Sequence, residues 1–125
     1  MFGFIKRFIT KEEAPIIEPT EPRMYLILRE DLAYKYIQGA HALSNFAIYC
    51  PLTFYQWGNK YLICLSTFNG LTLKHEYERL KELHICSIPF FEPDLESDLP
   101  TAIAVYEDGR GIVKDALSHL KLATK

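Results

Sequence analysis

Residues 24–42 read MYLILREDLAYKYIQGAHA, and this stretch decides the fold class. Its first six residues form an apolar run with little alternation, which is typical of a strand buried on both faces of a sheet. Asp31 follows the run, and aspartate is a favoured helix-capping residue, so we expect a helix over residues 32–49. A buried strand that leads directly into a helix is typical of an α/β domain.

The rest of the chain continues this alternation. Apolar runs predict three more strands, and an apolar stripe at helical spacing predicts a second long helix. The resulting order βαβαββα predicts a three-layer α/β/α domain with a four-stranded mixed sheet. The expected elements are a loop at residues 51–59, a strand at 60–67, a helix at 71–83, a strand at 84–91, an exposed loop at 92–100, a strand at 101–106 and a helix at 111–122.

The segment before the domain has a different character. Residues 1–10, MFGFIKRFIT, are amphipathic but far shorter than the roughly 20 residues of a membrane span. Pro15, Pro19 and Pro22 favour an extended chain, so residues 1–22 are predicted to be a tail and linker, and residues 23–125 the domain. The tail is open to three interpretations: a docking segment for a protein partner, a membrane-surface segment, or a flap that folds back on the domain.

Composition limits the classes of function. The formal net charge is −2, whereas proteins that bind phosphates non-specifically are usually more basic, so nucleic-acid binding requires a local patch. The three cysteines, Cys50, Cys64 and Cys86, are widely spaced and contain no Cys-x-x-Cys pair. They are predicted to be reduced core residues in a reducing compartment, so we expect a cytoplasmic protein without a metal site or cofactor.

The first predicted helix has two faces. Gln38 and His41 lie on its polar face, which begins where the first strand ends. The predicted packing face consists of Ala33, Tyr36, Ile37, Ala40, Ser44 and Ala47, which recur at three- and four-residue steps.

Chemistry is expected at the carboxyl edge of the sheet, where ligands of open α/β sheets gather. The side chains expected there are Arg29, Glu30, Asp31, Lys35, Gln38, His41, Ser66, Thr67, Asn69, Glu92 and Asp94. They include a candidate base, cations and an amide donor, which suffices for hydrolysis or for binding a polar ligand. The sequence contains neither a nucleophile-elbow motif nor a phosphate-binding glycine loop.

Three short motifs carry a resemblance to a known family. They are MYLILREDL at residues 24–32, QGAHA at 38–42 and SHLKLA at 118–123. In this order the motifs resemble the type II peptidyl-tRNA hydrolase family, over about residues 23–123. The resemblance implies a mixed-sheet α/β fold and hydrolysis of the ester that joins a peptide to the ribose of tRNA.

The resemblance also implies roles for individual residues. Glu92 or Asp94 would orient or deprotonate the attacking water, and Lys35 would stabilise the oxyanion. The substrate-binding residues would be Arg29, Asp31, Gln38 and His41.

One departure from the family opens a second hypothesis. The connection before Gln38 is shorter than in the family, and Tyr34 stands where the family has a lysine. A side chain one residue further along a helix points about 100° away, so Lys35 is a displaced substitute. The alternative is therefore a catalytically inactive binding module for a nucleotide, a tRNA end or a protein partner. A homodimer is a further option for a small α/β domain.

Overall fold

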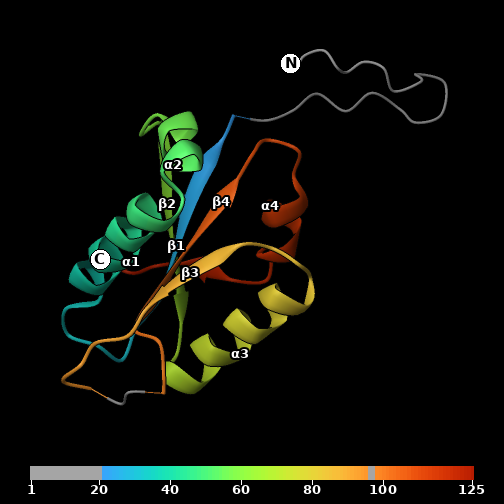
Figure 1. Ribbon diagram of the computed structural model, residues 1–125. Coiled ribbons are helices and arrows are strands. Elements are labelled where there is room, and N and C mark those ends of the chain that lie inside the picture. The colour runs from blue at the N-terminus through green and yellow to red at the C-terminus, as the bar shows by residue number, and fades with distance from the viewer. Residues whose placement is uncertain (1–20, 96–97) are drawn as a thin grey trace, which may run out of the picture.

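The computed structural model describes residues 21–95 and 98–125 (Figure 1). The predicted tail therefore lies outside the described residues, except for its last two. In chain order the elements are β1 (Arg23–Arg29), α1 (Lys35–Tyr49), α2 (Pro51–Trp57), β2 (Tyr61–Thr67), α3 (Gly70–Glu82), β3 (Ser87–Phe90), β4 (Ala102–Glu107), α4 (Ile112–Ala116) and β5 (Lys121–Leu122).

The strands form one mixed sheet in the order β3-β4-β1-β2-β5. β1 and β2 are parallel, whereas β4 is antiparallel to both β1 and β3, and β5 is antiparallel to β2. α1 and α2 cover one face of the sheet, and α3 and α4 cover the other (Figure 1). The α/β class and the mixed sheet are thus confirmed.

The predicted number of strands is wrong, because the sheet has five strands and not four. The helix predicted over residues 111–122 already ends at Ala116. The Ser118 hydroxyl donates to the carbonyl oxygen of Asp115 at 2.9 Å, a local bond that competes with helix continuation. The chain then turns, and Lys121 and Leu122 extend beside β2 as β5.

Pro51 begins a helix where a loop was predicted. The residue occupies the first turn of α2, where a missing N–H and a fixed φ are favourable. Pro51 therefore both ends α1 and starts α2. At its other end α1 begins at Lys35, later than predicted, and Asp31 pairs with Arg29 instead of capping the helix.

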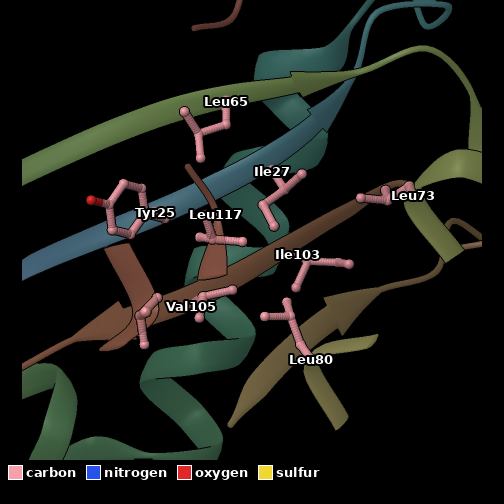
Figure 2. Packing of buried hydrophobic residues seen from close by; sticks show 9 residues of the cluster. Tyr25, Ile27, Leu65, Leu73, Leu80, Ile103, Val105 and Leu117 are labelled. Carbon is pink, nitrogen blue, oxygen red and sulfur yellow. The ribbon is translucent and has the colours of Figure 1, made fainter. Parts of the chain in front are cut away.

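The core consists of two clusters, one on each face of the sheet. Side chains of β1 alternate between them: Met24 and Leu26 pack toward α1 and α2, whereas Tyr25 and Ile27 pack toward α3 and α4. Figure 2 shows the second cluster, in which strand residues meet Leu73, Leu80 and Leu117 from the covering segments. The prediction that the first strand is buried on both faces is confirmed.

The predicted packing face of the first helix is wrong. Tyr36 and Ile37 are 46% and 54% exposed. The buried residues of α1 are Lys35, Gln38, Gly39, Ala42 and Phe46. Gly39 lies so close to β1 that an added Cβ atom would stand 2.8 Å from Cδ2 of Leu28. Gly39 thus lets α1 approach β1 closely, and the helix packs through the face that contains this glycine. The apolar residue types had instead predicted that the neighbouring face of the helix would pack against the sheet.

Replacing Gly39 by valine is expected to lower the free energy of unfolding by about 1–3 kcal/mol, because the new side chain overfills a packed contact. Ala40→Val is the matched control, since Ala40 is the next residue of the helix and is exposed. Urea denaturation of both variants measures the difference. Equal effects of the two substitutions would contradict the close helix–strand contact.

No helix in the described part of the chain is long and apolar enough to cross a membrane.

Candidate functional site

The carboxyl ends of three strands meet at one edge of the sheet. β1 and β2 are parallel, and β1 and β3 are both antiparallel to β4, so all three run in the same direction. α1 follows β1 and therefore begins at this edge. We call this region the carboxyl edge, and it contains the residues that follow β1, β2 and β3.

Gln38 joins α1 to the segment after β3 through two side-chain hydrogen bonds. Its amide nitrogen donates to Oε2 of Glu92 at 3.3 Å, and its amide oxygen accepts from the hydroxyl of Thr101 at 2.8 Å. Thr101 is fully buried and also donates to the carbonyl oxygen of Phe90 at 3.1 Å. The glutamine therefore has a fixed orientation, and so has the carboxylate that it contacts.

His41 lies one turn further along the same helix. Its ring stacks on Phe90, with 4.5 Å between the centroids and 14° between the planes. The histidine is exposed, so one face of its ring is covered by Phe90 while the edge faces solvent. Gln38 contacts Glu92 and His41 stacks on Phe90, so both helix residues lie against the end of β3 and the residues that follow it.

Arg29 and Asp31 form a second unit. Nη2 of Arg29 donates to Oδ2 of Asp31 at 2.8 Å and Nε donates to Oδ1 at 3.1 Å, a two-pronged arrangement that fixes both groups. Nη1 also donates to the carbonyl oxygen of Pro100 at 3.3 Å. Gly70 leaves room for the guanidinium, because a Cβ atom there would stand 2.8 Å from Nη1.

Lys35 belongs to a third unit, which is formed with the C-terminal segment. Its Nζ atom contacts the carboxylate of Glu30 and donates to the hydroxyl of Thr124 at 2.7 Å. The hydroxyl and backbone N–H of Thr124 also donate to Glu30, at 2.8 and 3.0 Å. The lysine side chain is only 11% exposed. We call Glu30, Lys35 and Thr124 the C-terminal clasp.

The clasp changes the acidity of Glu30. Hydrogen bonds from Lys35 and then from the backbone of Thr124 lower the pKa of Glu30 from 4.5 to about 2. Because the pKa is lower in the folded state, the clasp stabilises the protein fully above about pH 4.5. This contribution is lost as the pH falls toward 2.

Glu30→Gln is therefore expected to destabilise the protein at pH 7 but to have a smaller effect at pH 3, because at pH 3 this carboxyl group is already protonated in the unfolded wild-type chain and part of the clasp's contribution is lost. Denaturant unfolding of both proteins at the two pH values measures this. Glu82→Gln, at an exposed position of α3, is the control and should show no such change. An effect of Glu30→Gln that is equal at both pH values would contradict the clasp.

Asp94 was also predicted to be a site residue, but it belongs to none of these units. It lies two residues after Glu92 and is exposed. A cavity of about 410 Å³ is lined by Glu30 of the clasp and by Thr67 at the end of β2. Its lining also includes Phe68, which is 82% exposed, and Lys121. Gln38 and Glu92 are not in this lining, so the cavity does not enclose the Gln38–Glu92 pair.

Sequence reasoning missed a charged cluster that contributes Glu76 and His119 to the lining of this cavity. The Nε2 atom of His119 lies 2.8 Å from Oε2 of Glu76. Arg79 contacts the other oxygen of Glu76 at 2.9 Å. Burial opposes ionisation of Glu76, but the bonds from His119 and Arg79 outweigh it and lower the pKa. The three-residue spacing of Glu76 and Arg79 was the available signal; the approach of His119 had none.

Within residues 21–95 and 98–125, no group of three or more His, Cys, Asp or Glu side chains is arranged to hold a metal ion. The arrangement at the carboxyl edge is instead one of organic acid–base groups. Glu92 is a half-buried carboxylate held by an amide, which is suitable for accepting a proton from water.

No family model matches the chain. A search of curated proteins also finds no match. The functional conclusion therefore depends on the site itself.

Proposed function

We propose that this chain is a divergent hydrolase of the type II peptidyl-tRNA hydrolase kind. Its substrate would be the ester of peptidyl-tRNA, or of a related aminoacyl or nucleotide conjugate. The contact between Gln38 and Glu92 carries this proposal, because it joins the helix motif QGAHA to a carboxylate 54 residues away.

The proposal is supported by where the resembling segments lie. The MYLILREDL segment contains the Arg29–Asp31 pair and Glu30. Thr124, which directly follows SHLKLA, donates its backbone N–H to Glu30. The QGAHA segment contacts Glu92 and Phe90. Segments that are far apart in the sequence thus converge on one edge, as a shared site requires.

In the proposed reaction Glu92 accepts a proton from a water molecule, whose oxygen attacks the carbonyl carbon of the ester. The tetrahedral intermediate then breaks its bond to the ribose oxygen, which takes the proton back. Gln38 holds the carboxylate in position, and the cavity beside Glu30 offers space for part of the substrate. Lys35 lies three residues before Gln38, and both are buried residues of α1. Its Nζ atom would have to leave the C-terminal clasp to reach an oxyanion.

The ion pairs that Arg29 and Lys35 form with neighbouring carboxylates favour a second candidate function. Arg29 is bound to Asp31 and Lys35 to Glu30, so each positive charge at the carboxyl edge already faces a carboxylate. An oxyanion gains little from a cation that is neutralised in this way. The alternative is an inactive module of the same fold that binds a nucleotide or a tRNA end.

One assay separates the two functions. Purified protein is incubated with tRNA that carries a labelled N-acylated amino acid, and release of the label is measured. Binding is measured in parallel with an analogue in which an amide replaces the ester. Turnover supports the hydrolase, binding of the analogue without turnover supports the module, and absence of both contradicts the proposal.

A further inference from the structure

Helix α1 and strand β3 run antiparallel and contact each other along their length. His41 stacks on Phe90, and further along the helix Nδ2 of Asn45 donates to the carbonyl oxygen of Pro89 at 3.3 Å. We call this line of contacts the α1–β3 seam. Because the two elements are antiparallel, residues nearer the C-terminus of α1 face residues nearer the N-terminus of β3. The seam therefore ends at the C-terminus of α1 and at the residue before β3.

Both of those positions are cysteines. Cys50 caps the C-terminus of α1 and is half-buried, and Cys86 immediately precedes β3 and is exposed. The prediction that the cysteines are core residues is therefore wrong for Cys86. Both line a cavity of about 490 Å³, together with Leu83, His84 and Tyr106. Cys50 and Cys86 therefore lie at the same end of the α1–β3 seam and line the same cavity.

The acidity of Cys86 agrees with this placement. Burial raises the pKa of the Cys86 thiol, and the interaction with Cys50 raises it further. The third cysteine, Cys64, lies on β2 and does not line this cavity. It provides an internal control.

We propose that Cys50 and Cys86 form a dithiol modification site, which a small disulfide such as oxidised glutathione converts into an intramolecular disulfide. The inference is independent of the proposed function. Its chemistry requires only two neighbouring thiols and an oxidant of that class.

The exchange has two steps. The exposed Cys86 thiolate attacks one sulfur of oxidised glutathione, the S–S bond breaks, and one glutathione thiolate leaves. The Cys50 thiolate then attacks the sulfur of Cys86 and displaces the second glutathione. The two cysteines lose two electrons in total, and the glutathione disulfide gains them. Because only thiolates attack, the raised pKa of Cys86 slows the exchange near neutral pH, and the exchange becomes faster as the pH rises.

The disulfide would connect the end of α1 to the start of β3. Gln38 and Glu92 lie at the opposite end of the same seam. Oxidation would therefore fix the helix relative to the strand without touching the carboxyl edge. Dithiothreitol would reverse it.

The test treats native protein with oxidised glutathione, alkylates the remaining thiols and measures the intact mass. We expect a product that has lost two hydrogens and retains one of the three alkylatable thiols. Its thermal unfolding midpoint should rise and return after reduction. Peptide mapping should join Cys50 to Cys86.

Matched variants decide the assignment. Cys50→Ser and Cys86→Ser should each stop at a glutathione adduct or remain unmodified, whereas Cys64→Ser should behave like the wild type. Phenylarsine oxide, which bridges neighbouring thiols without oxidising them, should bind the wild type and Cys64→Ser but neither of the other variants. Native protein that forms only glutathione adducts, or a disulfide that includes Cys64, would overturn the proposal.

Discussion

Replacing Glu92 by glutamine is expected to reduce ester hydrolysis by about 10²–10⁴-fold, the usual contribution of a positioned acid–base group. Glutamine has nearly the same shape and can still accept the hydrogen bond that Gln38 donates to Glu92. It cannot accept a proton from water. The thermal unfolding midpoint should therefore remain nearly unchanged while turnover of labelled acyl-tRNA is lost.

Asp94→Asn is the matched control for this variant. The substitution removes the same charge from the same loop. The side chain of Asp94 is exposed, and the hydrogen bond from Gln38 is made to Glu92 and not to Asp94. Turnover of this variant should stay within about twofold of the wild type. Loss of turnover in Asp94→Asn with retention in Glu92→Gln would transfer the role of base to Asp94.

Replacing Glu107 by alanine is expected to lower the free energy of unfolding by about 3–5 kcal/mol, because a fully buried carboxylate that accepts three hydrogen bonds is removed. Its Oε2 atom accepts from the backbone N–H groups of Gly109 and Gly111, at 2.6 and 2.8 Å. Its Oε1 atom accepts from that of Lys114 at 2.9 Å. Glu107 thus organises the turn between β4 and α4.

The neighbouring residue supplies the control for Glu107. Asp108 forms an exposed ion pair with Arg110 at 2.8 Å, and such surface pairs contribute about 0–1 kcal/mol. Guanidinium denaturation should therefore separate Glu107→Ala clearly from Asp108→Ala. Similar losses in the two variants would show that Glu107 does not hold the turn.

The fold class could be predicted because its signal is local. The apolar run of β1 and the alternation of elements need no knowledge of distant contacts. The face of α1 could not be predicted from residue type, because tertiary partners override it. Lys35 and Gln38 are buried because Glu30, Thr124, Glu92 and Thr101 satisfy their polar atoms.

The candidate site also has one part that could be predicted from the sequence and one part that could not. The general rule for carboxyl edges was enough to predict that Gln38 and Glu92 lie near each other. The C-terminal clasp was not predictable, since it depends on a two-residue strand that positions Thr124. A strand of that length has no periodicity of its own, and only its pairing with β2 defines it.

The place of β1 in the sheet has a consequence for how the chain folds. β1 comes first in the sequence among the described strands but lies in the middle of the sheet, between β2 and β4. Its partner β4 begins only at Ala102, so a long loop must close before the central pairing forms. Folds dominated by such non-local pairings fold slowly. Until β4 pairs with it, β1, whose residues 24–29 are all buried in the folded protein, has an open edge, and we expect the unpaired strand to favour aggregation at this stage.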